Sequence, residues 1–145
     1  MISFVCGQLC CGKTKYAQAL AFATNGVYVE VGDIVRELKG SQDRDVLQDS
    51  KHLLTDIIAR LSIKVKFYGD KDVIVSGVRQ QEILQAFPNS TLLWIECPTP
   101  LRKERYLNRS REGDDQTFET AERGDIQLGI FGVKQYIFQQ NEIKL

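Results

Sequence analysis

A glycine-rich segment near the start of the chain has the residue types and spacing of a phosphate-binding loop. It matches the pattern G-x-x-x-x-G-K-[ST], and its eight residues are Gly7, Gln8, Leu9, Cys10, Cys11, Gly12, Lys13 and Thr14. Glycine lets the loop turn sharply and brings backbone N–H groups close to phosphate oxygens, while the lysine supplies a positive charge to the terminal phosphates. The threonine hydroxyl in this pattern is a ligand for Mg²⁺. The segment predicts binding of a nucleoside triphosphate with Mg²⁺.

The nucleotide is expected to be ATP. A GTPase carries an Asn/Thr-Lys-x-Asp segment that reads the guanine base after a later strand, and this sequence has none.

Three polar side chains that follow later apolar segments could bind and activate a second substrate. Asp33 and Arg36 come after the apolar residues 27–31, and Arg79 comes after residues 73–75. A guanidinium offers a planar fork of N–H donors that matches phosphate oxygens and stays charged at any working pH. Asp33 could orient or deprotonate an acceptor hydroxyl, bind Mg²⁺ through water, or cap a helix.

More basic residues lie in the helix expected after Pro98. Arg102, Arg105 and Arg109 are spaced by three and four residues, so they are predicted to share one helix face. We expect them to form one cationic surface.

Alternating strands and helices would position these residues. The apolar pattern predicts strands at residues 2–6, 27–31, 73–75, 91–95 and 136–138. It predicts helices at residues 13–24, 34–38, 46–68 and 80–87, and another after residues 98–100. Continuous apolar runs are typical of strands buried on both faces of a parallel sheet. Arg36 and Arg79 then lie at the strand ends, the edge where such sheets bind ligands.

Composition favours one compact domain over the 145 residues, with 43% hydrophobic and 26% charged residues. Lysine plus arginine balance aspartate plus glutamate at 19 each, so no overall field draws the protein to nucleic acid or membrane. The four cysteines lack C-x-x-C spacing and a histidine partner, which favours reduced thiols in a cytosolic protein over zinc or disulfides. No apolar run approaches the ~18 residues of a membrane span, so no membrane partner is expected.

Taken together, these segments resemble nucleotide-kinase-like proteins, especially the dephospho-CoA kinase and adenylate kinase relatives among the P-loop kinases. Residues 31–36, Val-Gly-Asp-Ile-Val-Arg, are similar to the family's G-D-x-x-R segment. Residues 76–79, Ser-Gly-Val-Arg, are similar to its D-G-x-x-R segment. The resemblance extends from residue 2 to about residue 141. It implies a three-layer α/β P-loop kinase fold, with about five parallel strands flanked by helices.

The resemblance also implies roles for the arginines. Arg36 and Arg79 would clamp the phosphate of the acceptor. Arg105 and Arg109 would close over the ATP phosphates and act in catalysis with Lys13 and Asp33, next to a short lid near residues 108–118.

One position departs from the family pattern. Ser76 stands where the family has an aspartate associated with the metal site. This leaves Asp33 as the only carboxylate expected near the loop, with Thr14 and Asp33 as the candidate Mg²⁺ ligands.

The function implied is that of an ATP-dependent kinase, in the cytoplasm or in a host's cytoplasm if the protein is viral. The acceptor is nucleotide-like: a (deoxy)nucleotide, a dephospho-CoA-like hydroxyl compound, or 5-hydroxymethyluracil in DNA, as for phage-type DNA-modifying kinases. Zero net charge counts against DNA as the acceptor. An alternative of another class is a nucleotide-binding sensor that has lost catalysis, which Ser76 favours.

Overall fold

Four parallel strands form the centre of the computed structural model, which describes residues 1–40, 53–109 and 117–143. They are β1 (Ile2–Gly7), β2 (Val27–Glu30), β3 (Val73–Ser76) and β4 (Thr91–Ile95), arranged in the order β2-β3-β1-β4. Every neighbouring pair is parallel, and parallel strands need crossover connections that helices supply. The predicted α/β fold is confirmed, with four strands among the described residues where about five were expected.

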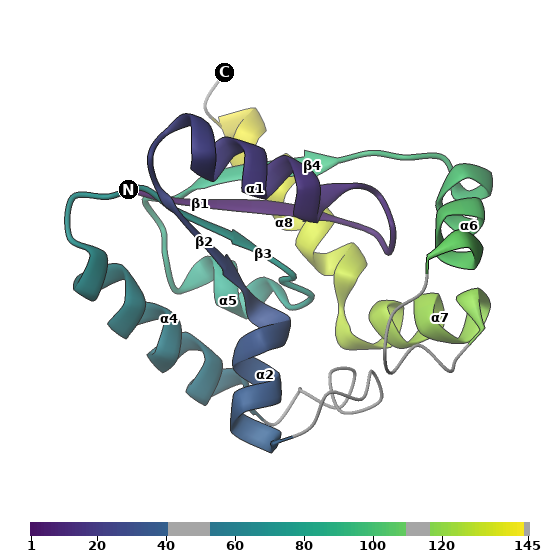
Figure 1. Ribbon diagram of the computed structural model, residues 1–145, viewed down its shortest axis with the longest axis horizontal. Helices are drawn as coiled ribbons and strands as arrows, with labels where there is room; N and C mark the ends of the chain where they lie inside the picture. Colours follow the sequence, from purple (N-terminus) through teal and green to yellow (C-terminus); the bar gives the residue numbers. More distant parts are fainter. Residues whose placement is uncertain (41–52, 110–116, 144–145) are drawn as a thin grey trace.

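Helices cover both faces of this sheet, so the molecule has three layers (Figure 1). Successive strand residues point to opposite faces, which sends Val5 and Phe4 into different cores. Val5 packs with Ala17 and Ala21 of α1, whereas Phe4 packs with residues of α4, α5 and α8. The helices are α1 (Lys13–Ala23), α2 (Val31–Lys39), α4 (Leu54–Tyr68), α5 (Gln81–Gln85), α6 (Thr99–Asn108), α7 (Phe118–Leu128) and α8 (Ile130–Ile143).

The C-terminal segment corrects one sequence prediction. Residues 136–138 are not a strand but lie inside α8. Ile130, Val133 and Ile137 of this helix are buried in the larger core. Their spacing of three and four residues is the helical repeat, and it outweighs the preference of a short aromatic and β-branched run for a strand.

Other boundaries follow local chemistry. β2 stops at Glu30 and α2 begins at Val31, because the Glu30 side chain accepts a hydrogen bond from the Gly32 N–H at the start of the helix. The helix predicted over residues 46–68 is described from residue 54, and residues 46–52 lie outside the described part of the chain. Most of the predicted lid near residues 108–118 also lies outside it. No helix in the described ranges has the length and apolar character to span a membrane.

Arg102 is buried rather than part of a cationic surface, which corrects the prediction that it shares an open face with Arg105 and Arg109. Its side chain is 2% exposed, and its guanidinium ion-pairs with Glu122 of α7 at 2.6 Å. The same guanidinium donates hydrogen bonds to the backbone oxygens of Leu9 at 3.1 Å and Cys97 at 3.2 Å. Arg102 therefore joins α6 and α7 to the loop after β1.

This burial predicts a large effect on stability. Arg102→Ala leaves Glu122 unpaired and the Leu9 carbonyl without its donor, so we expect the free energy of unfolding to fall by about 3 kcal/mol. Chemical denaturation followed by circular dichroism measures the change.

Lys103→Ala is the matched control one residue along the same helix. Lys103 pairs with Glu119 at 2.8 Å, but both side chains are at least half exposed, so the change should stay within about 0.5 kcal/mol. A similar small loss for Arg102→Ala would show that the buried pair does not hold these elements together.

Candidate active site

A cavity of about 1060 Å³ opens where the strands end, at the edge of the sheet that carries the glycine-rich loop. Its walls come from the loop after β1, the end of β2 with the start of α2, the segment after β3, and α6. Its polar lining includes Lys13, Thr14, Tyr28, Glu30, Asp33, Arg36, Arg79, Arg105 and Arg109.

The glycine-rich loop connects a fully buried strand to the start of a helix, as its pattern predicts. Gly12 immediately precedes α1 with φ of 94°, a left-handed conformation that glycine adopts without steric cost. Residues 9–14 line the cavity, whereas Gly7 and Gln8 do not. The Lys13 ammonium donates to the Gln8 backbone oxygen at 3.4 Å. Burial and the nearby Arg79 charge lower the pKa of Lys13, so an anion in the cavity would favour its charged form.

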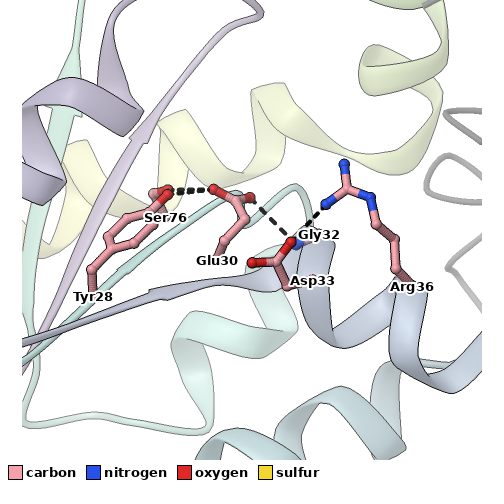
Figure 2. A network of polar contacts seen from close by, with 6 residues as sticks. All are labelled: Tyr28, Glu30, Gly32, Asp33, Arg36 and Ser76. Atoms are coloured by element: carbon pink, nitrogen blue, oxygen red, sulfur yellow. Dashed lines mark hydrogen bonds and ion pairs between the residues drawn. The ribbon is translucent and has the colours of Figure 1, made fainter. Parts of the chain in front are cut away.

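Asp33 and Arg36 form an ion pair on the first turns of α2. The Asp33 carboxylate lies 2.8 Å from the Arg36 guanidinium, and the two side chains are 66% and 19% exposed. Figure 2 shows this pair beside the end of β2. Asp33 therefore keeps an accessible carboxylate at the cavity wall.

Glu30 lines the cavity, as does Glu104 of α6, which makes the expectation that Asp33 is the only carboxylate there wrong. Glu30 accepts hydrogen bonds from the Tyr28 hydroxyl at 2.6 Å and the Ser76 hydroxyl at 2.8 Å (Figure 2). Burial alone would raise the pKa of Glu30, but these donors and the charges of Arg79 and Lys13 outweigh it and lower the pKa. Glu30 is consequently ionised at neutral pH.

Tyr28 lies between this carboxylate and the strand end of β3, near the phosphate loop. Its hydroxyl hydrogen-bonds to Glu30 at 2.6 Å and to Ser76 at 2.8 Å, and the Thr14 side chain is near enough to affect its pKa. Burial together with the Glu30 charge raises the pKa of Tyr28 to about 12, so the hydroxyl stays protonated and can donate.

Arg79 is held against the wall by a buried acid. Its Nε donates to the Asp125 carboxylate of α7 at 2.8 Å, and another guanidinium nitrogen donates to the Gly77 carbonyl at 3.2 Å. The Asp125 charge raises the pKa of Arg79. Because Arg79 lines the cavity, its positive charge faces any bound anion.

Arg105 and Arg109 close the side of the cavity formed by α6. The Arg105 guanidinium donates to the Cys10 backbone oxygen of the loop at 3.3 Å. The Arg109 guanidinium stacks over the Tyr106 ring, 4.6 Å from its centroid. Both lie where a charge on a loop-bound phosphate would attract them.

Sequence reasoning missed Glu30, Tyr28 and Asp125. Glu30 and Tyr28 could have been found from alternation, since residues 28 and 30 of a strand point to the same face and Glu30 is the last residue before the helix. No local signal marks Asp125, because it reaches Arg79 from a helix far along the chain.

The solved structures that resemble this chain include small-molecule kinases. Shikimate kinase from Acinetobacter baumannii, in complex with shikimate, has a TM-score of 0.64 at 13% identity, covering 96% of this chain and 78% of that one. Shikimate kinase from Aquifex aeolicus has a TM-score of 0.56 at 17% identity, covering 88% and 81% of the two chains. A gluconokinase from Sinorhizobium meliloti has a TM-score of 0.55 at 18% identity, covering 88% and 74%. At these identities the likeness establishes the fold.

Comparison of the sequence with family profiles assigns the chain to a family. No curated protein matches it. A family profile described as AAA domain matches residues 4–127, which run from β1 through nearly all of α7 and contain every cavity residue described above. The chain therefore belongs to the AAA domain family.

Proposed function

We propose that this protein is an ATP-dependent phosphotransferase that moves the terminal phosphate of ATP to a small, anionic, nucleotide-like acceptor. The observation that carries the proposal is that the phosphate loop and the acceptor-side residues Asp33, Arg36 and Arg79 line the same cavity. Its volume of about 1060 Å³ is at the upper end of the ~300–1,000 Å³ typical of ligand pockets, which suits two substrates side by side.

The donor side consists of the loop and α1. Backbone N–H groups of the loop and the N-terminus of α1 would bind the ATP phosphates, and Lys13 would add a charge at the terminal ones. Arg105 and Arg109 would meet the charge that develops on the phosphate during transfer, a role worth ~10³–10⁵ in rate for arginine fingers.

The metal requirement fits the residues present. Mg²⁺, when bound, neutralises charge on the terminal phosphates and fixes their geometry. Thr14 and a carboxylate of the cavity wall would hold it, since both line the same cavity. Clusters of three or more potential metal-binding side chains do not occur in the described ranges, which is compatible with Mg²⁺ bound through one or two carboxylates plus phosphates.

The acceptor side would bind an anionic group and present a nucleophilic oxygen. Arg36 and Arg79 supply two guanidinium groups whose orientation Asp33 and Asp125 already fix. The acceptor oxygen would form a bond to the terminal phosphorus while the bond from that phosphorus to the leaving oxygen of ADP breaks. Where the acceptor is a hydroxyl, Asp33 would take its proton.

Other functions are less well supported. Nothing in the described structure favours modified DNA as acceptor, since the cationic residues line a cavity rather than an extended groove. The sensor hypothesis depended on the absence of a carboxylate at position 76, but the Glu30 carboxylate lies 2.8 Å from the Ser76 hydroxyl. All four cysteines are free, in keeping with a reducing cytoplasmic location.

A transfer assay tests the function. Wild-type protein with labelled ATP and Mg²⁺ is expected to label a small molecule in a panel of nucleoside monophosphates, dephospho-CoA, shikimate and gluconate. Hydroxymethyluracil-containing DNA belongs in the same panel. Labelling of DNA alone would replace the proposed acceptor class, and nucleotide binding without transfer to any acceptor would favour a sensor.

The loop lysine provides the first variant. Lys13→Ala should lower kcat about 10²–10³-fold, because a preorganised charge at the transferred phosphate is lost. Lys66→Ala, an exposed lysine of α4 away from the cavity, should leave kcat unchanged. Equal activity of Lys13→Ala and wild type would refute catalysis at this loop.

The acceptor arginines should affect the acceptor and not ATP. Arg36→Met and Arg79→Met each remove a charged hydrogen-bond donor, so KM for the acceptor should rise about 10- to 100-fold while KM for ATP changes little. Arg60→Met is the control: Arg60 is an exposed arginine of α4 that pairs with Glu37 at 3.4 Å outside the cavity. A rise in KM for ATP alone would place these arginines on the donor side.

A further inference from the structure

We propose that Glu30, together with Thr14, holds the Mg²⁺ that accompanies the bound nucleotide, in place of an aspartate at position 76. This inference rests on the proposed function and deepens it, since it assigns the metal-binding carboxylate of the same site to a different strand.

The register of the sheet is the first argument. Glu30 and Ser76 are the last residues of β2 and β3, and they are direct partners across the parallel pair. Their side chains meet, with the Ser76 hydroxyl 2.8 Å from a Glu30 carboxylate oxygen. The Oγ of serine occupies the position that the carboxylate carbon of an aspartate would take. Because a carboxylate oxygen lies about 1.2 Å from its carbon, an aspartate oxygen at residue 76 could come within about 2 Å of the point that the Glu30 oxygen occupies.

The Tyr28 hydroxyl lies near both the carboxylate and the loop threonine. It donates a hydrogen bond to Glu30 at 2.6 Å, and the Thr14 side chain is near enough to affect the pKa of Tyr28. Thr14, whose hydroxyl the phosphate-loop pattern assigns to Mg²⁺, lines the same cavity as Glu30. The two proposed ligands therefore lie on the same part of the cavity wall.

The Glu30 carboxylate has capacity for a further partner. A carboxylate offers about four lone-pair sites, and three donors reach this one: Tyr28, Ser76 and the Gly32 N–H at 3.3 Å. Gly77 leaves space beside this carboxylate, because a Cβ at position 77 would collide with it. Gly77 also has φ of 89°, a conformation that favours glycine. The chain thus makes room for Glu30 at the end of β3.

Asp33 is the weaker candidate for the metal. Its carboxylate is 66% exposed and already paired with the Arg36 guanidinium at 2.8 Å. Glu30, by contrast, lines the cavity together with Lys13 and Arg79, so a bound dication and the phosphate charges would balance there. Asp33 would then serve the acceptor rather than the metal.

Manganese binding to the ADP complex tests the assignment without catalysis. Mn²⁺ replaces Mg²⁺ and is titrated into protein plus ADP while the free ion is followed by electron paramagnetic resonance. Glu30→Gln keeps the size of the side chain and an amide oxygen that can accept from Tyr28 and Ser76, but it removes the charge, so Mn²⁺ affinity should fall at least about tenfold. Asp33→Asn should stay within about twofold of wild type.

A double variant moves the carboxylate back to β3. Glu30→Ala, which vacates the space beside position 76, combined with Ser76→Asp should recover most of the Mn²⁺ affinity that Glu30→Gln loses, which a purely structural role of Glu30 would not produce. If Glu30→Gln alone does not fold, the double variant decides: near-wild-type affinity supports the assignment, and a tenfold loss overturns it.

Two results would overturn the assignment directly: unchanged Mn²⁺ affinity in Glu30→Gln, or a loss confined to Asp33→Asn. Failure of the proposed function looks different, because wild-type protein would then bind Mn²⁺ and ADP with the Glu30 dependence intact but transfer phosphate to no acceptor.

Discussion

The buried guanidinium of Arg102 is the interaction on which the geometry of the site depends. It holds the loop by the Leu9 carbonyl, ion-pairs with Glu122 of α7, and stacks over the Phe118 ring at 5.5 Å. One side chain thus positions α6 and α7 relative to the phosphate loop. Because α7 also carries Asp125, which holds Arg79 at 2.8 Å, the placement of an acceptor-side arginine depends on the same anchor. The donor and acceptor sides are mechanically connected through α7.

The arginine side chains that line the cavity are already held in place by acidic side chains or by the backbone. Arg36 is held by Asp33, Arg79 by Asp125, and Arg105 by a loop carbonyl, so each guanidinium is oriented at little entropic cost on binding. Zero net charge over the chain is therefore compatible with a strongly cationic cavity, since the balancing acids sit behind or beside the arginines. Preorganisation of this kind is what phosphoryl transfer requires, because its catalysis is mostly positioning and electrostatic stabilisation.

The parts of this arrangement that were predictable from sequence are those governed by local rules. The loop at residues 7–14 needs glycines and a lysine at fixed spacing, and the β-α alternation follows from apolar periodicity. The predicted strand at residues 136–138 was wrong because Ile130, Val133 and Ile137 repeat at helical spacing and are buried together, which outweighs the strand preference of three consecutive residues. Arg102 and Arg105 share the spacing that predicts one face, yet one is buried and the other exposed, since α7 covers only part of that face.

Glu30 shows why a missing residue in a motif is weak grounds for a missing function. A sequence motif describes residues of one strand, but a site at the edge of a parallel sheet is assembled from several strands. Residues that pair across neighbouring strands, such as Glu30 and Ser76, bring their side chains to the same place. A longer acid on β2 can therefore reach the point that a shorter acid on β3 would occupy, provided that the β3 residue is small and its neighbour has no side chain. Ser76 and Gly77 meet both conditions. The departure at position 76 and the acid at position 30 are thus one compensated change, visible only once the strands are paired.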